Sequence, residues 1–228
     1  MSSILGPELE PPSPVAQPIR HPVMTQYWAD VVFLHWRYEP ELVQKLLPSG
    51  MSVDVHDGSA WVALVPFRME RLGLPGLGTL PFVATFPGVN VRTYVHAGDR
   101  RGVWFFSLDI DLLLPTVVAR TVYDLPYCYG RAHHERVCDI VATSVDRRWP
   151  SRPGGAKVGI VVRCGQPPTD RDPLTNFLTS RWGLLVGHAT DNGHDAIVRL
   201  QIDEIVPVME IVVVGPVLGR RFGTANLG

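Results

Sequence analysis

Short segments of β-branched and aromatic residues, separated by turn-forming residues, constrain the fold of this chain most strongly. Residues 89–96 and 103–109 are two such segments on either side of a turn at residues 98–102, a pattern typical of a β-hairpin. Residues 131–149 and 156–164 show the same alternation. Strands that are joined by short turns pair antiparallel. The sequence therefore predicts a mostly antiparallel sheet.

Three short segments are expected to be helical instead. Pro40 suits the first turn of one helix, where its missing amide hydrogen has no partner to lose. Residues 111–123 form a second helix with Asp111 as its cap, and Asp172 caps a third that runs through Leu178. Together with the strands, these segments predict a mostly antiparallel α+β domain with two or three short helices. We expect its sheet to curve toward a closed barrel or cone.

Two turn signals add detail to this prediction. Asp57 and Gly58 lie between strand-like residues 51–56 and 60–67, and Asp-Gly is a strong signal for a two-residue hairpin turn. Residues 71–81 are rich in glycine and proline. They are expected to form a loop of the length that often covers a site.

Composition limits the domain organisation and the partners. The chain has 228 residues, 46% of them hydrophobic, and a formal net charge of -1, which fits a globular protein with a substantial core. The proline-rich residues 1–22 predict an extended arm and residues 23–228 a single domain. Without a basic cluster or a long apolar segment, we expect neither a nucleic-acid nor a membrane partner. A homo-oligomer is compatible with the sequence, which does not determine the oligomeric state.

Motifs for metals and cofactors are weak. His133 and His134 lie near Cys138, but adjacent strand residues point to opposite faces, so no shared metal site is predicted. The sequence has no phosphate-binding glycine loop and no dinucleotide fingerprint, so no cofactor is expected. Its three cysteines form no disulfide framework, which indicates a cytoplasmic protein.

One run in the sequence resembles a known catalytic motif. From residue 119 the chain reads Ala-Arg-Thr-Val-Tyr-Asp-Leu-Pro-Tyr. Arg120 and Pro126 match the spacing of a motif of the acetoacetate decarboxylase superfamily, in which a Schiff-base lysine follows the proline. Here Tyr127 takes the place of that lysine.

Ordered blocks between residues 26 and 184 also resemble the YqjF-like family DUF2071. That family is grouped with acetoacetate decarboxylase-like folds, so the resemblance implies a β-barrel cone around a deep, mostly apolar pocket. The matching blocks are residues 28–30, 35–36, 47–48, 57–62, 90–95, 102–109, 125–127 and 177–182.

The chain departs from the decarboxylase pattern at three positions. Tyr127 cannot form an imine, because imine formation needs a free amine. Gly88 lies where related sequences keep a glutamate, and the arginine that holds the substrate carboxylate falls near Thr25 or Gln26. Neither of the two lysines of the chain is an obvious substitute. These departures argue against acetoacetate decarboxylation through an imine.

Residues near Gly88 offer another kind of site. If Gly88 faces the pocket, the period of a strand places Asn90, Arg92 and Tyr94 on the same face. Arg92 is a candidate catalytic residue, since a guanidinium group can hold a carboxylate or stabilise an enolate oxygen. The alternative is a structural arginine that is paired with an acid such as Asp109.

Tyr127 is the second candidate catalytic residue, either as a hydrogen-bond donor or as a general acid. The alternative is that Tyr127 is a core tyrosine whose hydroxyl group has a hydrogen-bond partner. Arg120 belongs either to the site or to a structural salt bridge, and both interpretations are kept. The candidate substrate-binding residues are Gln26, Trp28, Phe86, Asn90, Tyr94, Phe106 and Arg120.

The sequence thus supports three hypotheses about function. The first is a small-molecule enzyme (a lyase, isomerase or cyclase) that acts on a carbonyl or carboxylate metabolite, such as a polyketide-like secondary metabolite, by non-covalent acid–base or electrostatic catalysis. The second is a non-catalytic protein that binds an apolar small molecule. The third is a structural protein whose barrel is filled.

Overall fold

A single twelve-stranded sheet makes up most of the described part of the chain. The computed structural model describes residues 24–122, 124–150, 156–165, 172–181, 183–186 and 196–199. The arm predicted for residues 1–22 therefore lies outside the described residues. The main path of the sheet, in spatial order, is β1 (Thr25–Ala29), β4 (Ala60–Leu74), β6 (Phe86–Ala97), β7 (Arg100–Ile110), β8 (Tyr127–Val137), β9 (Ile140–Trp149) and β10 (Lys157–Arg163).

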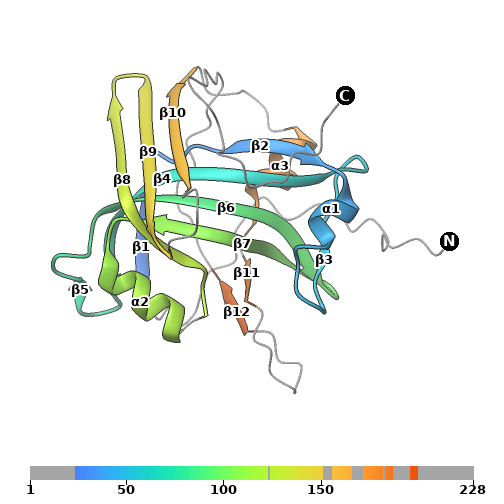
Figure 1. The fold of residues 1–228 in the computed structure, drawn as a ribbon, viewed down its shortest axis with the longest axis horizontal. Coiled ribbons are helices and arrows are strands. Elements are labelled where there is room, and N and C mark those ends of the chain that lie inside the picture. The colour runs from blue at the N-terminus through green and yellow to red at the C-terminus, as the bar shows by residue number, and fades with distance from the viewer. Residues whose placement is uncertain are drawn as a thin grey trace.

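Five shorter strands join this path at its sides (Figure 1). They are β2 (Leu34–Tyr38), β3 (Ser52–Val53), β5 (Gly78–Thr79), β11 (Gly183–Val186) and β12 (Ala196–Arg199). Most pairs are antiparallel, as predicted, while β7 pairs in parallel with both β8 and β11. The path ends at β1 and β10, which do not pair with each other. The predicted closed barrel is therefore not confirmed for the described part of the chain.

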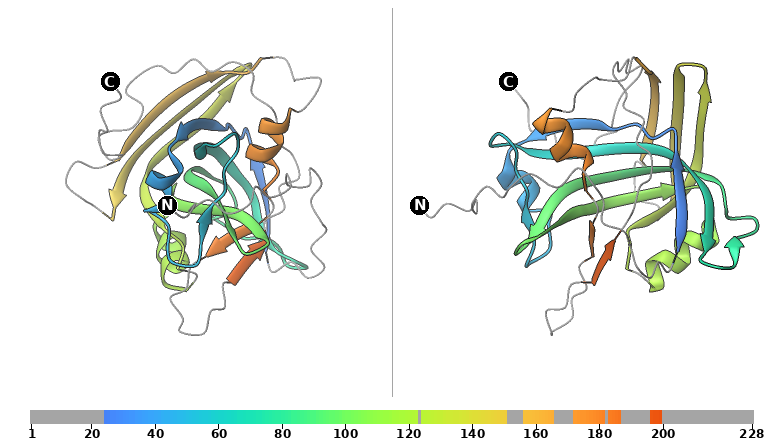
Figure 2. Two further views of the ribbon diagram at one scale, coloured as in Figure 1. Left: turned by 90° about the vertical axis from the view of Figure 1, so that its right-hand side faces the viewer. Right: turned by 180° about the vertical axis from the view of Figure 1, so that it is seen from behind.

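The strands form two layers. In Figure 1, β8, β9 and β10 run across the direction of β4, β6 and β7, and Figure 2 shows them as a separate layer. Leu64 and Val89 from the central strands pack against Val141 and Ile160 from β9 and β10. This contact covers one face of the central strands and leaves the opposite face for the candidate site.

The three helices expected from the sequence are present. They are α1 (Pro40–Gln44), α2 (Leu113–Val122) and α3 (Pro173–Thr179). Pro40 occupies the first turn of α1, and Asp172 caps α3 by accepting a hydrogen bond of 2.6 Å from the backbone amide of Thr175. Among the described residues, no helix has the length and apolar character needed to cross a membrane.

The turn at Asp57 and Gly58 forms, but it does not join the predicted strand pair. Both residues have positive φ angles, 50° and 70°, and the backbones of His56 and Ser59 exchange hydrogen bonds of 3.0 and 3.1 Å. However, β3 pairs with β6 rather than with β4. The reason is that the start of β4 is already paired with β2 on one edge and β6 on the other.

The loop predicted for residues 71–81 is also partly wrong. Strand β4 continues to Leu74, and β5 returns beside it with Gly73 opposite Thr79. Glycine at position 73 allows this close return, because an added Cβ would lie 2.4 Å from the carbonyl oxygen of Gly78. The glycines that suggested a loop therefore form a narrow hairpin.

Candidate functional site

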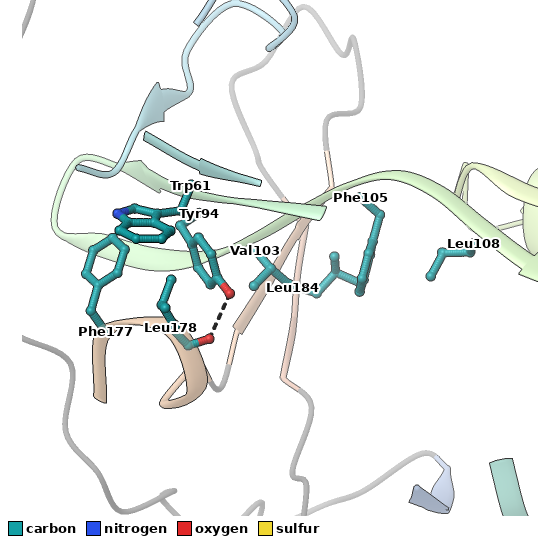
Figure 3. Packing of buried hydrophobic residues seen from close by; sticks show 8 residues of the cluster. All are labelled: Trp61, Tyr94, Val103, Phe105, Leu108, Phe177, Leu178 and Leu184. Atoms are coloured by element: carbon teal, nitrogen blue, oxygen red, sulfur yellow. Dashed lines mark hydrogen bonds between the residues drawn. The ribbon is translucent and has the colours of Figure 1, made fainter. Parts of the chain in front are cut away.

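Strand β6 presents alternate residues to the two layers, as its sequence predicts. Val89 belongs to the cluster shared with β9 and β10, whereas Tyr94 belongs to a cluster with Trp61 and Phe105 on the opposite face (Figure 3). Gly88, Asn90 and Arg92 share the face of Tyr94, which we call the inner face. Most other residues on this face are apolar, so a polar residue here is unusual.

Asn90 and Arg92 are buried on the inner face without enough partners. They are 1% and 3% exposed. Both side-chain polar atoms of Asn90 and the Nε of Arg92 lack a hydrogen-bond partner. A buried polar group without a partner costs about 1–3 kcal/mol, and more when it is charged. The pair is therefore a candidate for binding a ligand that supplies the missing partners.

No carboxylate among the described residues forms an ion pair with Arg92. Asp109, its suggested partner, is held instead by Arg147 through two hydrogen bonds of 2.6 Å. The register explains this, because Asp109 lies opposite Val89 and therefore on the other face of the sheet. The guanidinium carbon of Arg92 lies 5.0 Å from the centre of the Phe33 ring and 5.6 Å from that of Tyr94. Arg92 is thus a buried cation on aromatic rings without a counter-ion among these residues.

Tyr127, the second predicted catalytic residue, lies on the same face but at a distance along the sheet. Leu108 pairs with Asn90 on one side and with Tyr127 on the other. Neighbouring strands lie about 4.8 Å apart, so the backbones of Asn90 and Tyr127 are separated by roughly 10 Å. The ring of Tyr127 packs against both apolar clusters of the inner face.

Burial raises the pKa of Tyr127 to about 12. Its phenol is therefore neutral near pH 7 and can donate a hydrogen bond, but it is a poor base. Among the described residues, Arg120 does not form the salt bridge of the structural alternative. Its Nη1 donates a hydrogen bond of 2.8 Å to the backbone oxygen of Tyr127, and its guanidinium group lies over the Trp149 ring. Arg120 thus holds the start of β8 in place.

The space beside Gly88 is filled. A Cβ added at Gly88 would lie 2.6 Å from Cζ of Phe67, and the ring of Phe67 is stacked on Trp28 with 4.1 Å between centroids. Phe86 belongs to the same cluster. The predicted site residues Trp28 and Phe86 therefore form an aromatic wall together with Phe67, which sequence analysis missed.

Two other predicted site residues, Phe106 and Gln26, do not lie beside Asn90 and Arg92. The register between β6 and β7 shifts at one point, where Val91 lies opposite Ser107 and Arg92 opposite Phe105. Phe106 is the extra residue of this bulge and packs on the outer face, while Phe105 takes the inner position (Figure 3). Gln26 lies at a similar irregularity in β1 and is only partly buried.

Tyr94 connects the inner face to His35 of β2. The Tyr94 hydroxyl donates a hydrogen bond of 2.8 Å to the carbonyl oxygen of Leu178 (Figure 3). Nε2 of His35 lies 2.7 Å from the same hydroxyl oxygen. Burial, and then the charge of Arg92, lower the pKa of His35 to about 3. This histidine is therefore neutral and lies within the electrostatic influence of Arg92.

Comparison with known proteins supports the resemblance seen in the sequence. The profile of DUF2071, an uncharacterized conserved protein family, matches residues 25–204. The chain belongs to this family. It is 32% identical over 162 residues to the uncharacterized protein YqjF of Bacillus subtilis (strain 168), a match that covers 71% of the chain and 66% of YqjF. The chain thus spans slightly less than two thirds of the length of this relative.

Solved structures show the same kind of fold. Acetoacetate decarboxylase from Legionella pneumophila has a TM-score of 0.52 and 13% identity over 86% of this chain and 74% of that one. An acetoacetate decarboxylase-like enzyme from Sphingomonas wittichii RW1 has a TM-score of 0.49 and 16% identity over 86% and 75%. The match to the Legionella structure shows that this chain has an acetoacetate decarboxylase-like fold. At these identities the likeness concerns the fold alone.

Proposed function

We propose that this protein is a small-molecule enzyme that holds a carbonyl or carboxylate metabolite at Asn90 and Arg92 and acts on it without a covalent intermediate. The observation that carries this proposal is the buried guanidinium group of Arg92, which has no counter-ion among the described residues. A carboxylate would satisfy both the charge and the free Nε donor. The amide of Asn90 offers a donor and an acceptor to the same ligand.

Schiff-base chemistry is not supported by the position of the lysines. Lys45 and Lys157 are the only lysines in the chain. Lys45 is exposed at the end of α1, and the side chain of Lys157 is 75% exposed beside Asp146. Neither amine is desolvated, so neither lies in the buried environment that activates a lysine for imine chemistry.

The remaining groups suit electrostatic and hydrogen-bond catalysis. Arg92 would stabilise negative charge as it develops on an enolate oxygen, an effect that is strong where water is excluded. Tyr127 would donate a hydrogen bond to a carbonyl oxygen from the far side of Leu108. Lyase, isomerase or cyclase reactions of a polyketide-like metabolite use such steps. Cys128, Cys138 and Cys164 form no disulfide bond in the described part of the chain, which supports a cytoplasmic location.

A second candidate function is the binding of an apolar small molecule without catalysis. The observation that favours it is the aromatic wall of Trp28, Phe67 and Phe86, which closes the position of Gly88. A binding protein would use this wall as its main contact and would need Arg92 only for orientation. The two functions therefore differ in how strongly binding depends on the carboxylate.

Thermal unfolding of the protein with matched ligands tests the proposal. We would compare octanoate, a 3-oxooctanoate and octanol, with wild type, Arg92→Met and Arg92→Lys. Ligand binding raises the melting temperature by mass action. We expect both acids to stabilise the wild type, octanol to have little effect, and Arg92→Met to lose the response. Equal stabilisation by octanol and octanoate would refute carboxylate binding and support the apolar binder.

A further inference from the structure

The hydrogen bonds around Tyr94 determine which nitrogen of His35 carries the proton. The carbonyl oxygen of Leu178 can only accept, so the single hydroxyl hydrogen of Tyr94 is donated to it. The hydroxyl oxygen must then accept from His35, whose Nε2 lies 2.7 Å away. A neutral imidazole carries a hydrogen on only one of its two nitrogens. Nδ1 of His35 therefore holds a free lone pair, and no described residue makes a hydrogen bond to it.

His35 and Arg92 lie in the same cross-strand row. Ala63 of β4 pairs with His35 of β2 on one side and with Arg92 of β6 on the other. Because Ala63 ends at its methyl group, the longer side chains on either side can approach each other above it. The ring of Phe33 completes the arrangement. It is nearly parallel to the imidazole, with 6.0 Å between centroids, and 5.0 Å from the guanidinium carbon.

We propose that His35 is the proton acceptor of this site and that Tyr94 is the positioning residue that keeps Nδ1 free. The inference rests on the proposed function and defines its substrate class more closely. The substrate would be an acid with an acidic C–H bond next to a carbonyl group, such as an oxo acid. Arg92 would hold its carboxylate, and Nδ1 would face the C–H bond.

The proton transfer balances without a further reactant. The C–H bond breaks, its electron pair becomes the C=C bond of an enolate, and the carbonyl π pair moves to oxygen. The proton moves to Nδ1 of His35, which becomes an imidazolium. Returning the proton to the same or to another carbon completes an exchange or an isomerisation.

Arg92 makes the protonation of His35 depend on whether the substrate is bound. In the free protein the guanidinium charge opposes protonation of His35, and a bound carboxylate would cancel that charge. The other groups near His35 change little. Tyr94 is neutral, and Arg181, which lies over the Tyr94 ring, is paired with Asp54 at 2.6 Å. Trp61, which meets the imidazole edge-on, carries no charge. We therefore expect the pKa of His35 to rise when an acid is bound, while burial still holds it below its ordinary value.

Nitrogen-15 NMR of the histidine rings tests the geometry without a ligand. The signals of His35 are assigned by their loss in His35→Asn. We expect wild type near neutral pH to show hydrogen on Nε2 and none on Nδ1. Tyr94→Phe should allow both tautomers, while His134, whose Nδ1 lies 2.7 Å from Thr143 Oγ1, should be unchanged as an internal control. Hydrogen on Nδ1 of His35 in the wild type would overturn the proposal.

Proton exchange in D₂O tests the chemistry. We would follow 2-oxobutanoate by proton NMR, with trimethylpyruvate, an oxo acid without such a C–H bond, as the binding control. The expected result is exchange of the methylene protons by wild type, loss of exchange in His35→Asn with binding retained, and slower exchange in Tyr94→Phe. Binding that depends on Arg92 but gives no exchange would overturn the role of His35 and leave the proposed function standing. If neither oxo acid binds but octanoate does, this inference fails and the proposed function stands; if none of these acids binds, both fail.

Discussion

Replacing Arg92 with methionine should make the protein more stable while removing its affinity for acids. Arg92 is 3% exposed, has no counter-ion among the described residues and leaves Nε without a partner. Replacing buried ionic groups with apolar side chains of similar size often stabilises a protein by about 1–4 kcal/mol. The lost contacts of Arg92 with the Phe33 and Tyr94 rings offset about 0.5–2 kcal/mol of this. We therefore expect a net gain of about 0.5–2 kcal/mol in the free energy of unfolding.

Arg181 provides a matched control with the opposite expected sign. It is also buried, at 4% exposed, but its Nη1 donates a hydrogen bond of 2.6 Å to Asp54. Removing one member of a buried ion pair leaves the other charge buried without a partner and lowers the free energy of unfolding by about 3–5 kcal/mol. Arg101, whose Nε lies 3.4 Å from Asp54, would keep part of the compensation. Arg181→Met should therefore destabilise the protein by about 2–4 kcal/mol.

Urea unfolding followed by circular dichroism distinguishes the two variants. The midpoint should rise for Arg92→Met and fall for Arg181→Met, with an unchanged slope in both, because the surface exposed on unfolding stays the same. A gain of 1 kcal/mol corresponds to about 2–4 °C in melting temperature for a chain of this size. If Arg92→Met instead lowers the free energy of unfolding by more than about 1 kcal/mol, Arg92 has a structural role and the reasoning is refuted.

Three further predictions concern stability. Burial lowers the pKa of His35 to about 3 and of His134 to about 4, so below about pH 6.5 only the unfolded chain takes up these protons. Stability should then fall with decreasing pH by up to about 1.4 kcal/mol per unit for each histidine, until the folded pKa is reached. Urea midpoints between about pH 4 and pH 7 measure this, and a slope that is unchanged in His134→Gln would contradict it for that residue. Gly88→Ala should lower the free energy of unfolding by about 1–3 kcal/mol, because its methyl group meets the Phe67 ring at 2.6 Å. The double variant with Phe67→Leu should lose less stability than the two single variants lose together. If the losses are additive in thermal melts, the clash is ruled out. Asp172→Ala removes the cap of α3 and should cost about 0.5–2 kcal/mol, whereas Asp172→Asn should retain most of it in the same melts.

Strand period allowed the inner face of the site to be predicted from the sequence. Asn90, Arg92 and Tyr94 share that face because β6 keeps its register with β4 without interruption. The position of Phe106 could not be predicted, since a bulge in β7 moves it to the outer face. No local residue pattern marks this bulge, which depends on how β7 is paired with β6.

The role of His35 was missed for a different reason. Its role depends on a hydrogen bond with Tyr94, which is 59 residues away in the chain. It also depends on the hydrogen bond from Tyr94 to the carbonyl oxygen of Leu178, which is 84 residues further along. Sequence analysis sees only a histidine in a strand, and such a residue is usually part of the core. An acceptor atom of the backbone, brought in by α3, determines the tautomer. That information is in the tertiary structure and not in any motif.

Two of the three departures from the decarboxylase pattern that the resemblance implies have different structural consequences. At Gly88 the ring of Phe67 fills the space of a side chain, so the position where the resemblance leads one to expect a carboxylate is closed. At Tyr127 a polar hydroxyl group remains on the inner face. The groups that still lack partners, Asn90 and Arg92, lie further along β6, in the rows that lead to Leu108 and to His35. A fold built for stability alone would place apolar residues at both positions. Under the proposed function, the site therefore lies further along the sheet than Gly88, toward β2.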